Sequence, residues 1–267
     1  MNNSIADKLE QIARNEQLIY NAGVEKGKAE VSEGIYEEAF EAGKKSEYDA
    51  FWDVYQNYGD KSNYNMAFAG VGWKKENFKP KYDIKPTNAQ YMFRYSQINA
   101  DLVEILENQG VVLDFSNVTN TDRIFADAQF THIGIVDLSN VVAVNSTFAN
   151  GSADYDLETI DKIILKDDGS NTFSSAFTNL NALKNITFEG VIGKNGISFQ
   201  WSKSLSRNSI VNIVSCLSTE TSGLSITLSE NAVNKAFATN TDGTNGSTSA
   251  EWLALIGTRT NWNISLV

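Results

Sequence analysis

The sequence predicts an α+β fold with an N-terminal helical, coiled-coil-like arm, a short solenoid with parallel strands, and a strand–helix C-terminal cap. The first indication is an internal repeat within Val112–Asn150, where Asp114 and Asp137 are equivalent at an offset of 23 residues. The second is a ladder of apolar residues that recurs further along the chain, and the third is a narrow apolar stripe near the N-terminus. Repeats with periods of 20–50 residues are typical of solenoids, in which each unit buries its apolar face against its neighbours.

Residues 1–47 are predicted to form a helical arm for oligomerisation or docking. Ser4 is a candidate N-cap, and apolar residues then recur at three- and four-residue spacing: Ile5, Leu9, Ile12 and Ile19. A stripe this narrow on a polar helix cannot bury itself alone, so these four residues are the candidate seam of a homo-oligomer, most simply a short parallel coiled coil. The alternative is a charged, helix-prone arm without fixed order.

Residues 48–80 are rich in aromatic side chains and are predicted to form an N-terminal cap. Phe51, Trp52 and Tyr55 would share one face of a helix that ends near Gly59. The end of a solenoid needs such a cover because its terminal repeat would otherwise leave apolar surface in water. An aromatic platform for a ligand is the alternative.

Residues 81–192 are predicted to form a degenerate leucine-rich-repeat solenoid. One phenylalanine recurs in a turn-like setting, at Phe68, Phe93, Phe125, Phe148 and Phe177. Apolar ladders follow the last three: Phe130-x-x-Ile133-x-Ile135, Leu157-x-x-Ile160-x-x-Ile163 and Leu183-x-x-Ile186-x-Phe188, with Leu102-x-x-Ile105 as a weaker copy after Phe93. The pattern L-x-x-L-x-L is typical of the strand of a leucine-rich repeat.

Residues 193–267 change pattern and are predicted to form the C-terminal cap. An amphipathic helix would bury Ile210, Ile213, Val214 and Leu217, and a strand at Leu224–Leu228 would lead into a helix capped by Ser229. A helix carrying Trp252, Leu255 and Ile256 and ending at Gly257 is followed by a final strand.

Composition and motifs argue against several classes of function. The net charge of −11 disfavours nucleic acid and anionic membrane as partners. The single cysteine, Cys216, is predicted to be a small buried apolar residue on a helix. The presence of a single histidine, His132, makes histidine-based catalysis improbable. The segment 167–171 contains two aspartates but has neither the spacing nor the glutamate of a calcium loop, so it predicts a turn. No nucleotide-binding, zinc-protease or serine-hydrolase motif is present in the sequence, so we expect no enzyme activity, no cofactor and no metal.

The turn Ser175-Ala176-Phe177-Thr178-Asn179, followed by Leu183-x-x-Ile186-x-Phe188, resembles the BspA-type leucine-rich repeat. The family's turn often carries a cysteine, which is missing here. The segments around 21–53 and 224–267 are similar to proteins encoded by phages and prophages of gut Firmicutes. The resemblance implies a phage structural or tail-associated protein, and by analogy with phage fibres a homotrimer is the first expectation for its oligomeric state.

The expected function is therefore that of a non-enzymatic virion structural protein (tail, baseplate, fibre or decoration) with a repeat body for host attachment. The arm would bind other virion proteins, and the body would bind a host-surface protein or glycan. The sequence lacks a secretory signal, so we expect synthesis in the bacterial cytoplasm and a final location in the virion. The alternative is a bacterial adhesion or protein-interaction module outside any virion.

The candidate recognition face consists of the residues expected to point outward from the strands. His132 is expected to be a surface residue rather than a ligand. The face comprises Thr131, His132, Asp137, Lys162, Asn185, Thr187 and Glu189. A face that is merely solvated, without any ligand, is the alternative.

Overall fold

The computed structural model describes residues 64–70, 72–151, 156–239 and 244–267. The chain divides into two units, Met1–Asp60 and Lys61–Val267, and all described residues lie in the second. The predicted arm, its seam residues Ile5, Leu9, Ile12 and Ile19, and the first part of the aromatic cap lie outside the described residues. The described part of that cap buries its aromatic side chains: Tyr64, Phe68, Trp73 and Phe78 are at most 8 % exposed.

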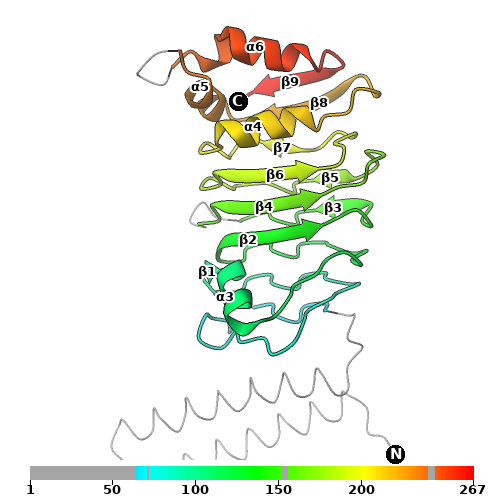
Figure 1. Ribbon diagram of the computed structural model, residues 1–267, viewed down its shortest axis with the longest axis vertical. Helices are drawn as coiled ribbons and strands as arrows, with labels where there is room; N and C mark the ends of the chain where they lie inside the picture. Colours follow the sequence, from blue (N-terminus) through cyan, green and yellow to red (C-terminus); the bar gives the residue numbers. More distant parts are fainter. Residues whose placement is uncertain (1–63, 71, 152–155, 240–243) are drawn as a thin grey trace, which may run out of the picture. The chain divides into compact units, whose positions relative to one another are not determined.

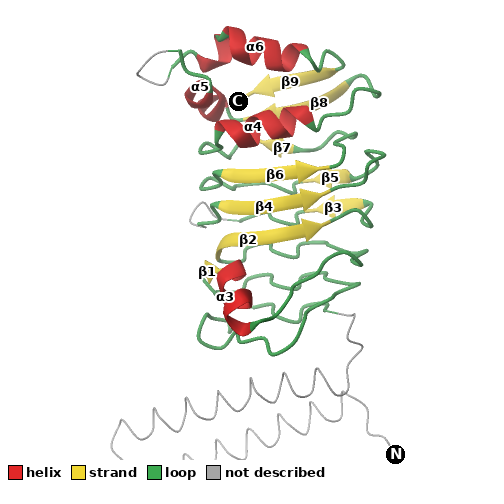
Figure 2. Ribbon diagram, viewed as in Figure 1, coloured by secondary structure: helices red, strands yellow, loops and turns green. Residues whose placement is uncertain are grey.

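The described part of the chain mixes short strands with short helices (Figures 1 and 2). In chain order the elements are β1 (Ala100–Asp101), α3 (Leu102–Gln109), β2 (Phe130–Asp137), β3 (Ala143–Asn145), β4 (Thr159–Ile164), β5 (Thr172–Ser174), β6 (Asn185–Glu189), β7 (Ser198–Phe199), α4 (Arg207–Ser215), β8 (Leu224–Leu228), α5 (Glu230–Ala236), the 3₁₀ turn η1 (Gly246–Thr248), α6 (Ala250–Gly257) and β9 (Trp262–Leu266).

The strands form three parallel sheets. The largest has the order β1-β2-β4-β6, and in Figure 1 β2, β4 and β6 lie one above the other and run in the same direction. β3 pairs with β5, and β7, β8 and β9 form the third sheet. Parallel neighbours need a crossover connection, so each return of the chain brings the next strand alongside the previous one.

A column of stacked phenylalanine rings runs through the core. The rings of Phe93, Phe125, Phe148 and Phe177 follow one another at centroid distances of 5.4–5.7 Å and interplanar angles of 6–12°. Phe68 stacks on Phe93 at one end. The five phenylalanines that recur in the sequence are therefore neighbours in space. The column also contains a ring that the sequence pattern missed, Phe199, which stacks on Phe177 at 4.7 Å.

The turns around these rings share one backbone conformation. The residue two positions before each phenylalanine from Phe68 to Phe177 is left-handed, and so is the residue two positions after it in four of the five turns. The turns are joined by main-chain hydrogen bonds; for example, Phe125 N–H donates to Thr147 O at 2.8 Å and Phe148 N–H to Ala176 O at 3.0 Å. Because each turn satisfies its backbone groups on the next turn, the same conformation has to be kept from one to the next.

The inner side of the strands differs from the predicted ladder at one position. Ile133, Val136 and Leu138 are buried after β2 begins, whereas Ile135 is 54 % exposed. β4 buries Ile160 and Ile163 at the positions paired with Ile133 and Val136. The prediction that Ile135 points inward is therefore wrong. Adjacent isoleucine and valine allow either register, and a shift of one residue exchanges the faces of a strand.

The weak ladder copy at Leu102 and Ile105 is a helix, not a strand. Asp101 caps α3 by accepting a hydrogen bond from the Glu104 N–H at 3.0 Å, and Gly110 ends the helix in the left-handed conformation. Leu102, Ile105 and Leu106 are buried at helical spacing. The same three-residue interval fits both a helix and a leucine-rich-repeat strand, and the capping residues decide for the helix.

α4 ends the largest sheet. The Ser209 hydroxyl accepts a hydrogen bond from the Ile186 N–H of β6 at 2.9 Å. The Asn212 amide accepts from the Phe188 N–H at 2.6 Å and donates to the Phe188 carbonyl at 3.1 Å. These side chains take the place of a further strand, and a covered edge cannot pair with another chain.

The C-terminal elements agree closely with the sequence. β8 has the predicted bounds, α4 buries Ile210, Ile213 and Val214, and α6 buries Trp252 and ends at Gly257. Leu217, predicted on the same helix as Ile210, is buried but lies beyond the end of α4, and Leu255 and Ile256 on α6 are half-buried. Ser229 flanks α5 as predicted but makes no side-chain capping bond. Its hydroxyl is instead buried without a hydrogen-bond partner among the described residues.

Candidate recognition face

The outward side of β2, β4 and β6, called the sheet face below, carries all seven predicted recognition residues. Asn185, Thr187 and Glu189 on β6 are exposed, and the other four are half-buried: Thr131, His132, Asp137 and Lys162. They come together because the strands are parallel and paired in register, with His132 opposite Thr159 and Thr159 opposite Asn185. The Asp137 carboxylate stabilises the turn after β2, because it accepts a hydrogen bond from the Ser139 N–H at 2.8 Å.

His132 is held between two aspartates. Its Nδ1 lies 2.9 Å from Asp101 Oδ2, and its Nε2 lies 2.8 Å from Asp161 Oδ1. The side chain of His132 is 25 % exposed, so the expectation of an exposed surface residue has to be corrected to a half-buried one. The reason is its register: pairing places Asp101 of β1 on one side of the ring, and β4 supplies Asp161 on the other.

This arrangement favours the imidazolium form of His132. Burial lowers the pKa of the ring, but the hydrogen bonds to both carboxylates and their negative charges outweigh it, so the pKa of His132 is raised above its usual value. Burial raises the pKa of Asp101, but bonds from the Glu104 N–H and from His132 outweigh this, and the pKa is lowered. His132 thus links the cap of α3 to β2 and β4.

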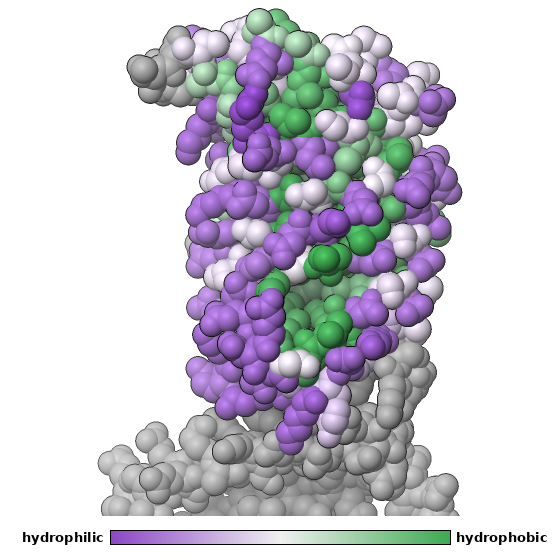
Figure 3. All heavy atoms as spheres, in the orientation of Figure 1, coloured by the Kyte–Doolittle hydropathy of each residue, from purple (hydrophilic) through white to green (hydrophobic). Residues whose placement is uncertain are grey.

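A second ion pair crosses the sheet face beside exposed apolar surface. Lys162 Nζ lies 2.7 Å from Glu189 Oε2, and Lys162 is the register partner of the exposed Ile135. Figure 3 shows hydrophobic side chains gathered in the middle of this side of the molecule, with hydrophilic ones around them. An apolar centre with a polar rim is the usual composition of a binding surface.

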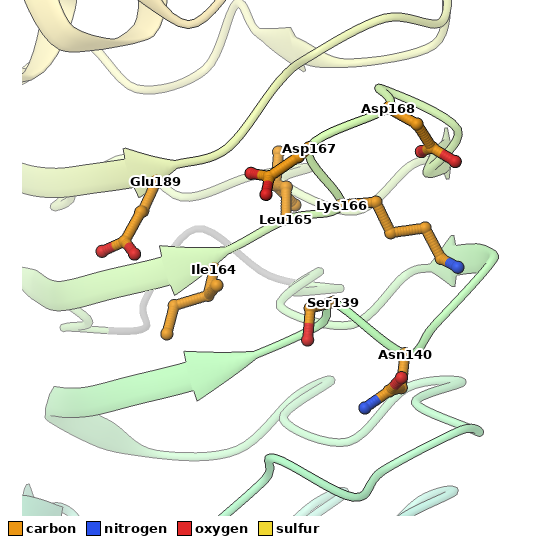
Figure 4. Close-up of a pocket in the computed structure, with 8 residues that line it drawn as sticks. All are labelled: Ser139, Asn140, Ile164, Leu165, Lys166, Asp167, Asp168 and Glu189. Atoms are coloured by element: carbon orange, nitrogen blue, oxygen red, sulfur yellow. The ribbon is translucent and has the colours of Figure 1, made fainter.

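A shallow hollow of about 480 Å³ lies at the carboxyl ends of the strands (Figure 4). Within it, Asp168 accepts the Ser170 N–H at 2.8 Å, so the segment 167–171 forms a turn. Hydrogen bonds from the side chain and backbone of Ser170 lower the pKa of the Asp168 carboxyl. The hollow is lined by Ser139, Asn140, Ile164, Leu165, Lys166, Asp167, Asp168 and Glu189. Its walls offer hydrogen-bond donors, acceptors and charge rather than a deep apolar cavity.

Cys216 caps the C-terminal end of α4 and is half-buried. Burial raises the pKa of its thiol, and Sγ lies 3.5 Å from the Phe188 carbonyl oxygen. Within residues 64–267, apart from the gaps given above, no three His, Cys, Asp or Glu side chains are grouped so that they would hold a metal ion. Over the same residues, no helix combines the length and the apolar character that crossing a membrane requires.

Comparisons of the chain with models of protein families, with curated proteins and with solved structures find no match.

Sequence reasoning missed three residues that shape the sheet face: Asp101, Asp161 and Ile135. Asp101 is 31 positions before His132, and nothing in the local pattern links the two. Asp161 had a weak signal, because it lies between the apolar positions Ile160 and Ile163 and must therefore point outward.

Proposed function

We propose that residues 81–192 form a leucine-rich-repeat-like solenoid and that the chain is a non-enzymatic structural protein of a phage virion, acting in attachment through its sheet face. The resemblance of the Phe177 turn to BspA-type repeats supports the setting. The observation that carries the binding role is the in-register face itself, where Ile135 lies exposed beside the Lys162–Glu189 pair and the His132 cluster. Its partner is a protein or glycan of the host surface.

The face is suited to recognition because its charged side chains are already held in place. His132 is bonded at both ring nitrogens, and Lys162 is paired with Glu189. Side chains that are fixed before binding lose less conformational freedom when a partner arrives. Ile135 supplies an apolar centre around which these polar groups are arranged.

The test is binding of the full chain to candidate host cells and to a printed array of their surface glycans. Ile135→Asp is expected to weaken binding about tenfold or more, because it places a charge at the centre of the contact. Leu253→Asp on α6 is the matched control, since Leu253 is 52 % exposed and Ile135 is 54 % exposed. Equal binding by the wild type and Ile135→Asp, on cells and glycans alike, would exclude the sheet face as the binding surface.

The virion setting has its own test. Mass spectrometry of purified virions is expected to find the protein at a fixed copy number per particle. If the protein is absent from virions but the Ile135-dependent binding is present, the bacterial adhesion or interaction module is the correct function.

A further inference from the structure

The left-handed turn positions carry unusual residues at one end of the phenylalanine column. At the later turns these positions hold small or polar residues that tolerate the conformation, such as Ser146, Ser175 and Asn179. At the earlier turns they hold Gly70 and Asp127 and, in addition, Met66, Tyr91, Tyr95 and Arg123, the last four with φ between 54° and 63°. Large side chains are rarely found in the left-handed region of backbone conformation, where they cost stability. Their presence at four neighbouring positions therefore indicates that these side chains have a role other than stabilising the fold.

Two arginines interleave with the two tyrosines. The Arg94 guanidinium lies 4.4 Å from the ring centroid of Tyr95 and 5.2 Å from that of Tyr91. Arg94 Nη2 also donates to the Tyr95 hydroxyl at 2.7 Å. Arg123 continues the row, since it lies 5.8 Å from the Tyr91 ring and donates to the Tyr91 hydroxyl at 3.1 Å. The four side chains, with the 61 % exposed Met66 of the preceding turn, are called the Tyr–Arg cluster below.

The cluster is positively charged within an acidic chain. Asp122 pairs with Arg123 at 3.2 Å. Arg94 has no carboxylate within 4.0 Å among the described residues, and its buried Nε has no hydrogen-bond partner among them. The chain as a whole carries a net charge of −11. A guanidinium that is held in place by aromatic rings and lacks a carboxylate is prepared to bind one from outside.

We propose that the Tyr–Arg cluster is a second interaction surface, separate from the sheet face, and that it binds an acidic peptide segment of a partner protein. Tyrosine and arginine are enriched at the energetic centres of protein interfaces, and methionine is enriched in interfaces relative to the rest of the surface. Arg94 binds a carboxylate of the segment, and the exposed part of the Tyr95 ring covers the apolar stem of that acidic side chain. Met66 adapts its shape to a neighbouring apolar side chain of the segment. The cation–π contacts hold the guanidinium in place before the partner binds.

The experiment selects a yeast-displayed library of random 12-residue peptides against the full chain. The wild-type chain is expected to enrich peptides with aspartate or glutamate about twofold or more over the unselected library, and Arg94→Gln is expected to remove that enrichment. Individual selected peptides are expected to bind Arg94→Gln about tenfold more weakly by fluorescence polarisation. The same peptides at 0.5 M salt should show a smaller difference, since salt screens the charged contact.

Arg207→Gln is the matched control. Arg207 also lies over an aromatic ring, 5.5 Å from the centroid of Phe237, but it is already paired with Glu251. This variant is expected to select the same acidic peptides as the wild type. Tyr95→Asn is a second variant, chosen because asparagine suits the left-handed backbone at this position. The melting curve of this variant separates a loss of binding from a loss of folding.

Three results would overturn the proposal. One is a selection without acidic enrichment, and another is an enrichment that Arg94→Gln leaves intact. The third is Arg94-dependent binding of an acidic polysaccharide such as alginate at equal or higher affinity, which would assign the cluster to glycans instead of peptides. Binding by the sheet face is measured with a different variant, so either proposal can fail alone.

Discussion

Replacing Phe148 by alanine is the strongest test of how the core is held together. The Phe148 side chain has no exposed surface, and its ring stacks between Phe125 at 5.7 Å and Phe177 at 5.5 Å. Removing a fully buried phenylalanine costs about 4 kcal/mol of unfolding free energy. In a unit of this size each kcal/mol corresponds to about 3 °C, so the melting temperature should fall by about 12 °C.

Phe148→Leu separates the ring contacts from the filled volume. Leucine retains most of the apolar volume but loses two ring pairs, each worth about 0.5–1.5 kcal/mol beyond the area buried. We therefore expect a loss of roughly 1–3 kcal/mol for this variant, smaller than that of the alanine variant. Urea titration of the full chain, followed by circular dichroism, measures both.

Two outcomes would refute this reasoning. A loss below about 1 kcal/mol for Phe148→Ala would mean that the column does not stabilise the core, because even an average substitution costs that much. Equal losses for the alanine and leucine variants would mean that ring stacking, and not volume, accounts for the whole effect.

Three further predictions concern particular contacts. Asn212→Ala should cost about 2 kcal/mol and promote aggregation, since it leaves the Phe188 N–H without a partner at the sheet edge and the Phe188 carbonyl with only the Cys216 thiol. Denaturant titration and light scattering measure the two effects. Because the pKa of His132 is raised in the folded state, its ion pairs should stabilise the fold fully below about pH 6.5. This contribution, about 1 kcal/mol, should be lost as the pH rises through the folded-state pKa. An NMR titration that gives His132 a pKa below the usual value would contradict this prediction. Gly196→Ala should lower the free energy of unfolding by roughly 2 kcal/mol more than Gly70→Ala. Both glycines have φ near 100°, but only at Gly196 would the added methyl group overlap a backbone carbonyl. Equal melting temperatures for the two variants would be inconsistent with this geometry.

Local signals in the sequence were enough for several elements. β8 has the predicted bounds, α4 buries three of its four predicted residues, and α6 buries Trp252, because each combines a clear apolar period with a turn or cap signal at its ends. The recurring phenylalanines were visible because one core position needs the same large ring in turn after turn. Phe199 was missed because its surroundings do not repeat the turn pattern.

The candidate site was predictable only in part. The alternation of strand residues was enough to place Lys162, Asn185, Thr187 and Glu189 on the outward side. It was not enough for Ile135, because the neighbouring Val136 offers an equally good inward residue and only the pairing with β4 decides between them.

By itself, the sequence determined which residues repeat and, in the C-terminal part of the chain, which local segments are helix or strand, because periodicity and capping act over a few residues. The tertiary structure alone decided which distant side chains meet: Asp101 and Asp161 on His132, Asn212 on the edge of β6, and Arg123 on Tyr91. These contacts join residues from successive turns of the chain or from adjacent elements, and their partners follow from the register of the parallel strands and the stacking of the turns. Register is a property of the assembled sheet, which no single segment of the sequence contains.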